Sequence, residues 1–112
     1  MRVISQDGTI DVPYEYISLV ISIAKCKDVE HVCIYCHNIS APHGTRLAEY
    51  STEAKAVKAM EMLREVYENN VFYHCTAGSK RFEEVQSILS EEQFRKATTE
   101  YFQFPQDDEI EV

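Results

Sequence analysis

The sequence predicts an α+β fold: one antiparallel β-sheet, built as a meander, with two or three helices packed on one face. Three observations support this class. Short runs rich in Val, Ile and Tyr, separated by turn residues, occupy the chain before Ser51. The segment that follows carries apolar residues at helical spacing. A last alternating run at 101–105 ends in a proline, as a final strand would.

The first element is a predicted hairpin over residues 2–12. Asp7-Gly8 lies between two β-branched runs, and glycine takes a positive φ there without steric cost. Pro13 has no N–H to donate, so it ends the second strand or places that strand at a sheet edge.

The next segments continue the meander. Residues 16–24 predict a strand buried on both faces, with a short helix as the alternative, because their apolar residues alternate only in part. The run 32–37 predicts a clearer strand. Asn, Ser, Pro, His and Gly within 38–44 predict a hairpin loop, and 45–50 predict the returning strand.

The strongest helix prediction begins at Ser51, whose hydroxyl can accept a bond from a free N–H of the first turn. Glu53 complements the positive end of the helix dipole. An apolar stripe follows at helical spacing: Val57, Met60, Leu63 or Arg64, and Tyr67. Asn69-Asn70 predicts the end of the helix, since Asn tolerates the left-handed conformation of a C-cap.

The remaining segments complete one domain over residues 1–105. They are predicted as a strand at 71–75, a helix at 79–89, a turn or helix from 90–92, and the last strand at 101–105. Residues 106–112 predict an acidic C-terminal tail. Its common role would be a mobile, solubilising end; as an alternative, it imitates nucleic-acid phosphates or docks on a basic protein.

The net charge of the chain limits the classes of function that it can have. The 112 residues include 19 acidic and 11 basic side chains, a net charge of -8. This balance argues against nucleic-acid binding, which needs a basic face. Four of the acids lie in residues 106–112, so the body is only mildly acidic and can accept a small anion. No stretch approaches a membrane span and no secretion signal is visible, which predicts a cytoplasmic protein with no membrane partner.

Cysteine and histidine form the first candidate cluster. Cys33 and Cys36 have the spacing of a zinc knuckle, but on a strand they point to opposite faces, so buried, reduced cysteines are the better interpretation. Cys75 follows His74, and strand neighbours cannot easily pair as nucleophile and base, which predicts a core cysteine. We therefore expect no metal, no cofactor and no enzyme activity, with a metal- or Cys-dependent enzyme as an alternative.

Anion binding is the second candidate. Basic pairs stand out in an acidic chain, and the turn before one of them opens a predicted helix whose N-terminus favours phosphate. Arginine binds phosphate through two bonds, and aromatic rings stack on a base. The candidate ligand-binding residues are Lys80, Arg81, Arg95, Lys96, His43, Arg46, Tyr73, Phe82 and Phe102. Ordinary surface charges beside core aromatics are the alternative interpretation.

Three sequence blocks carry a resemblance to a family of small phage and prophage accessory proteins: MRVISQDG at the start, EYSTEAKA at 49–56, and FQFPQDDE at 102–109. In size and plan the chain also resembles the Thoeris anti-defence sponges, which sequester a signal of the cyclic ADP-ribose type without cleaving it. The resemblance implies a homo-oligomer that binds a nucleotide-derived immune signal, either of that type or a cyclic oligonucleotide. The alternative is an acidic inhibitor of a host defence protein, similar to an anti-CRISPR.

Overall fold

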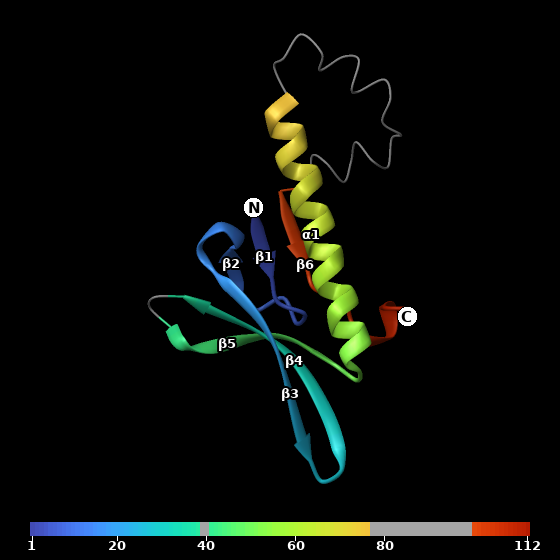
Figure 1. Cartoon of the computed structure of the whole chain (residues 1–112). Coiled ribbons are helices and arrows are strands. Elements are labelled where there is room, and N and C mark those ends of the chain that lie inside the picture. Colours follow the sequence, from blue (N-terminus) through green and yellow to red (C-terminus); the bar gives the residue numbers. More distant parts are fainter. Residues whose placement is uncertain (39–40, 77–99) are drawn as a thin grey trace.

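The computed structural model describes residues 1–38, 41–76 and 100–112, and its backbone forms two three-stranded sheets and a long helix (Figure 1). The strands are β1 (Arg2–Ile4), β2 (Asp11–Pro13), β3 (Ser18–Cys26), β4 (Val29–Asn38), β5 (Ala41–Tyr50) and β6 (Tyr101–Gln103). The helical elements are α1 (Glu53–Thr76) and the short 3-10 helices η1 (Tyr14–Tyr16) and η2 (Asp107–Glu109). The predicted α+β class is confirmed, with two sheets where one was expected. The helices predicted at 79–89 and from 90–92 lie outside the described residues.

The first sheet has the order β2-β1-β6. β1 and β2 form the predicted antiparallel hairpin, and Gly8 in its turn has a φ of +78°. Pro13 is the last residue of β2, which is an edge strand, as its missing N–H requires. β6 pairs in parallel with β1, so the predicted last strand closes the sheet from the other end of the chain.

The second sheet is the antiparallel meander β3-β4-β5. The strand interpretation of 16–24 is therefore confirmed over the helical one, although no described residue of β3 is fully buried. Lys27 and Asp28 both have positive φ and form a two-residue turn from β3 to β4. The predicted loop at 38–44 is too long, because β5 already begins at Ala41, opposite Asn38.

The cap of helix α1 lies one residue later than predicted, and the helix, which begins at Glu53, ends later than predicted. Thr52, not Ser51, accepts the first-turn bond, from Lys55 N at 3.2 Å. The predicted stop at Asn69-Asn70 and the predicted strand at 71–75 are wrong, since α1 continues to Thr76. Neither Asn has the positive φ of a C-cap, and the interior cost of Asn in a helix is only about 0.5 kcal/mol.

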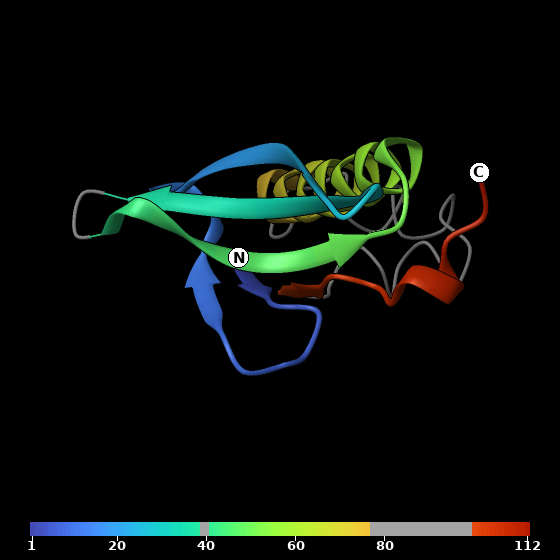
Figure 2. The same cartoon turned by 90° about the horizontal axis from the view of Figure 1, so that it is seen from below.

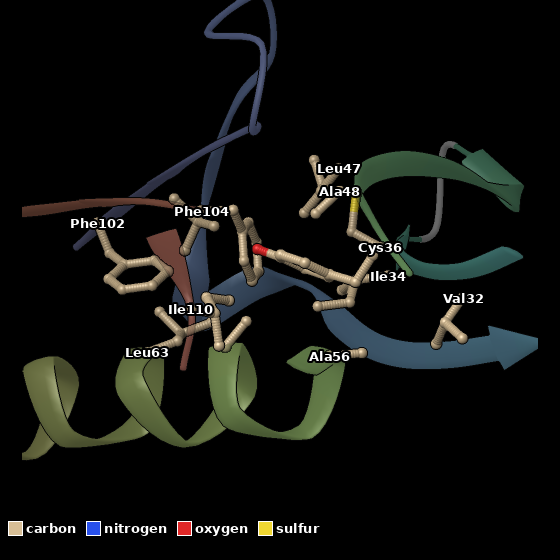
Figure 3. Packing of buried hydrophobic residues seen from close by; sticks show 13 residues of the cluster. Val32, Ile34, Cys36, Leu47, Ala48, Ala56, Leu63, Phe102, Phe104 and Ile110 are labelled. Carbon is tan, nitrogen blue, oxygen red and sulfur yellow. The ribbon is translucent and has the colours of Figure 1, made fainter. Parts of the chain in front are cut away.

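The core lies where α1 meets both sheets (Figure 3). Tyr50 of β5 is buried, and its hydroxyl donates a hydrogen bond to Pro105 O at 2.8 Å. Burial raises the pKa of this phenol, so it stays a neutral donor. Phe102 and Phe104 pack edge to face beside Leu63 of α1, with ring centroids 5.3 Å apart.

The C-terminal residues are part of this core, which corrects the expectation of a mobile tail. Ile110 is only 5% exposed and packs with the core residues of α1 and β6. The Asp107 carboxylate accepts bonds from Ser51 N at 2.7 Å and Lys55 Nζ at 3.1 Å. These donors, Ser51 N first, hold the pKa of Asp107 below its usual range. The sequence predicts a mobile segment because charged residues outnumber apolar residues in 106–112. In the structure the burial of Ile110 holds the segment in place.

The molecule is elongated, measuring 58 × 34 × 19 Å. Its radius of gyration is 16.2 Å, whereas a compact domain of this length would have about 13 Å. Figure 1 shows the cause: the β3–β4 hairpin and the C-terminal half of α1 project in opposite directions. Figure 2 shows the first sheet beyond β5, and α1 on the side of β3. β3 and α1 therefore form one flank of the molecule.

Candidate functional site

A groove of about 630 Å³ lies between β3 and α1. Its β3 side presents Ile17, Leu19 and Ile21. These residues alternate along the chain, so they point to the same face of the sheet. All three are half-buried, so the groove keeps an apolar wall that is open to solvent.

The α1 side of the groove is the apolar stripe that the sequence predicted. Val57, Met60, Arg64 and Tyr67 line it, at the three- and four-residue spacing that puts side chains on one helix face. The small residues Ala56 and Ala59 on the neighbouring stripe are fully buried against the core. One face of α1 thus holds the helix to the sheet and the adjacent stripe lines the groove.

One end of the groove carries two aromatic rings and the charges. Tyr14 of η1 and Tyr67 of α1 have ring centroids 4.4 Å apart, tilted by 39°. Arg64 lies one turn before Tyr67 and is exposed, and among the described residues it makes no ion pair. Glu15 is bonded by the Met1 amino group at 2.7 Å.

Among the residues that the structure describes, Arg64 is the available cation at the aromatic end of the groove. The hydrogen bond from the Met1 amino group lowers the pKa of Glu15, so this carboxylate is ionised, with its Oε1 bonded to that amino group. Arg64 keeps its guanidinium donors for an incoming group, and guanidinium groups bind phosphate in two-bond geometry. The tyrosine rings offer flat apolar surfaces beside it. The combination suits a planar ligand with an anionic group.

Five of the residues predicted to bind an anion lie outside the described part of the chain: Lys80, Arg81, Phe82, Arg95 and Lys96. His43 belongs to β5, and only its backbone is described. The other three are Arg46, Tyr73 and Phe102, which lie on β5, α1 and β6 respectively. None of these three lines the groove.

Arg46 lies on the sheet face that does not pack against α1. It pairs across the strands with Tyr35, and its guanidinium is 3.4 Å from Glu49 Oε2. The other oxygen of Glu49 is 2.6 Å from His31 Nδ1. Arg46 also borders a smaller hollow of about 410 Å³ beside Gln6. Its charge is thus shared with a carboxylate, which weakens its attraction for a second anion.

The two aromatic candidates take different positions. Phe102 is 7% exposed and packs in the core against Phe104, so its ring is not available for stacking at the surface. Tyr73 is half-buried in the last turns of α1, with its ring edge-on to His74 at 5.5 Å. His74 lies 3.8 Å from Glu100, just before β6. The interpretation as core aromatics therefore holds for Phe102.

The cysteines of β4 are free and buried, as expected: Cys33 is 6% exposed and Cys36 is 3% exposed. Burial raises the pKa of the Cys36 thiol. The prediction of a core residue at Cys75 is wrong, since this thiol is exposed on α1. Within the described residues there is no cluster of three His, Cys, Asp or Glu side chains able to hold a metal ion. Nor does any helix there combine the length and apolar character needed to cross a bilayer.

Comparison of the chain with protein-family models, curated proteins and solved structures found no match. The functional site of the chain is therefore inferred from the geometry of the groove itself. Sequence patterns predicted the helical stripe and a strand at 16–24, which supply two of its walls, but not the groove between them. They missed Tyr14, which lies in a single-turn element between two strands, and no periodic signal marks such a residue.

Proposed function

We propose that this chain is a binding protein that holds a planar anionic small molecule in the groove between β3 and α1. The observation that carries the proposal is the placement of Arg64 beside the Tyr14–Tyr67 ring pair, above an apolar wall. The groove volume of about 630 Å³ is within the range of small-molecule sites, roughly 300–1,000 Å³.

A nucleotide-derived molecule has the required chemistry, since it joins a planar base to phosphates. The base would stack on a tyrosine, and the phosphate would accept bonds from Arg64. Together with the phage-like sequence blocks, this supports a finer proposal: a phage-type anti-defence protein that sequesters an immune signal in the cytoplasm of its bacterial host. Its ligand is then of the cyclic ADP-ribose type or a cyclic oligonucleotide, and is released unchanged.

Calorimetric titration tests the proposal with a panel of cyclic ADP-ribose isomers and cyclic oligonucleotides. We expect one class to bind the wild type and Arg64→Gln to weaken that binding about 10- to 100-fold, since a hydrogen bond to a charged group contributes about 1.5–3 kcal/mol. Lys58→Gln is the matched control, because it removes the same charge from α1 outside the groove. Its affinity should equal that of the wild type.

Recovery of the ligand separates sequestration from catalysis. After the complex is denatured, mass spectrometry should find the bound molecule intact. A cleaved product would instead show that the protein is an enzyme. No heat with any member of the panel would reject the finer proposal. Equal losses of affinity in Arg64→Gln and Lys58→Gln would show that the ligand does not bind in the groove.

A further inference from the structure

The two outer edges of the second sheet differ. The edge of β5 is covered near its C-terminal end: Gln6 N donates to Leu47 O at 2.8 Å, and the Gln6 side chain bonds Glu49. The nine residues of β3 pair with β4 alone among the described strands, so their other edge is unpaired. In an antiparallel ladder alternate residues direct their N–H and C=O groups away from the partner strand. Counted from the turn after Cys26, these are Leu19, Ile21, Ile23 and Lys25.

Over residues 18–24 the β3 edge lacks the features that usually protect an edge strand, and the charged residue of this strand, Lys25, lies next to the turn. Such strands are kept from pairing by prolines, charges or bulges. Residues 18–24 contain no proline and no charged side chain, and the register shifts of this sheet lie between β4 and β5. Val20 and Ile23 are 44% and 45% exposed. The nine residues of β3 span about 30 Å, and the uncharged residues 18–24 make up most of that length.

We propose that β3 is the interface with a second copy of this chain, paired antiparallel about a two-fold axis at Ile21. The three-stranded sheets of the two copies then join into one continuous sheet. This proposal goes beyond the proposed function, because it requires no ligand.

Charge complementarity favours a second copy in this register over other occupants. Antiparallel pairing about Ile21 places Lys25 of one copy opposite Ile17 of the other, and Lys27 opposite Glu15. The two basic ends therefore lie far apart, and each lysine-bearing turn approaches an acidic residue of the other copy. Glu15 is 41% exposed and stays accessible beside the Met1 amino group. Parallel pairing would instead bring Lys25 against its own equivalent, and like charges directly opposite destabilise a sheet.

The pairing also has a consequence for the groove. Residues directly opposite in an antiparallel pair lie on the same face of the sheet. Leu19 and Ile21 of both copies then share one face, and the two α1 helices cover that face. The two grooves adjoin across the axis, and the open side of each is walled by the other copy.

Mass measurement and cross-linking test the interface without ligand. Light scattering with size exclusion should give twice the chain mass of 13.0 kDa at several concentrations. A chain carrying Cys26→Ser and Cys75→Ser provides the background for Ile21→Cys. On mild oxidation this variant should form a disulfide-linked dimer, because the two equivalent residues face each other at the axis. Ala24→Cys in the same background is the control, since its two copies are about 20 Å apart along the strands.

A third variant blocks the edge itself. Ile23→Pro removes an N–H that points away from β4, so the chain should fold with an unchanged circular dichroism spectrum and become monomeric. A monomeric wild type would overturn the proposal. So would disulfide formation at Ala24→Cys that equals or exceeds that at Ile21→Cys. Neither result depends on the calorimetric titration, so the proposed interface and the proposed ligand site can be rejected independently of each other.

Discussion

The side-chain amide of Gln6 hydrogen-bonds both main-chain groups of Glu49. Its Oε1 accepts from Glu49 N at 3.0 Å, and its Nε2 donates to Glu49 O at 3.1 Å. The same Nε2 donates to Pro105 O at 3.0 Å, while Gln106 donates to the main-chain oxygen of Gln6 at 2.7 Å. One residue therefore joins β5, the segment after β1, and the C-terminal segment.

Replacing this amide should destabilise the whole fold. Gln6→Ala loses three side-chain hydrogen bonds of about 1 kcal/mol each, so we expect the free energy of unfolding to fall by about 2–3 kcal/mol in urea denaturation. Gln103→Ala is the control, because its amide makes one bond, of 3.4 Å, to Ser5 O. Its loss should stay below about 1 kcal/mol. Equal losses in the two variants would contradict the bridging role of Gln6.

Gly44 should tolerate no side chain, because two effects act there together. It has a φ of +83°, and a Cβ would lie 2.7 Å from His37 Cε1. The left-handed backbone alone costs roughly 1–2 kcal/mol, so Gly44→Ala should lose more than that in thermal unfolding. Gly8→Ala is the matched control: its φ is +78°, but the nearest atom, Gln103 Nε2, is 3.5 Å away. Adding His37→Ala should recover part of the Gly44→Ala loss, and no recovery would argue against the steric cause.

The C-terminal anchor predicts a sharp contrast between two apolar residues. Ile110→Ala should lower the free energy of unfolding by about 2–4 kcal/mol, since the side chain is 5% exposed and its removal leaves a cavity. Val112→Ala, at 75% exposure, should change it by less than about 0.5 kcal/mol. A small effect at both positions would mean that the last residues are not packed in solution.

This contrast also decides how the acidic-inhibitor alternative should be tested. Deleting 106–112 would remove Ile110 and Asp107 and so weaken the fold itself. Charge neutralisation by Asp108→Asn and Glu111→Gln leaves both anchors in place.

Asp7 gives the stability a dependence on acid pH. Its carboxylate accepts bonds from Thr9 Oγ1 and Ser5 Oγ, both at 2.7 Å, and from Thr9 N at 3.0 Å. These donors, the Thr9 hydroxyl first, lower the pKa of Asp7 from 3.8 to about 2. A carboxyl with a lower pKa in the folded state stabilises the fold above its unfolded pKa and loses that contribution as the pH falls through the folded value.

The loss at Asp7 should therefore occur between about pH 4 and pH 2. Denaturant titrations at pH 7, 4 and 2.5 should show the wild type losing more stability over this range than Asp7→Asn, which carries no charge to titrate. A direct NMR titration of the Asp7 carboxyl should have its midpoint near 2. A midpoint at the ordinary value, or identical pH profiles, would contradict the assignment.

Local patterns in the sequence identified most elements of the fold. Asp7-Gly8 predicted the first hairpin, the apolar run at 32–37 predicted β4, and alternation predicted β6, because these signals require only neighbours in the chain. The end of α1 was missed for a physical reason. Asn69-Asn70 and the β-branched or aromatic residues after them have only weak preferences against helix, and the contacts of α1 overrule them.

Long-range contacts account for the rest. No local pattern shows that β6 pairs with β1, or that Asp107 bonds Ser51. The helical side of the groove could be predicted from the sequence, because Val57 and Met60 repeat at helical spacing. The contact between Tyr14 and Tyr67 could not, because it depends on the path of the chain around β2. The anion-binding candidates were chosen by charge, and charge alone does not fix which residues meet.

The unequal edges of the second sheet also limit how far an assembly grows. A two-fold pair uses the same β3 surface of both copies, so it closes on itself once formed. Further strands would have to add at β5, where Gln6 already bonds the main-chain groups of Leu47 and Glu49. Gln6 thus opposes the growth of an open-ended fibre of stacked sheets at the C-terminal end of β5.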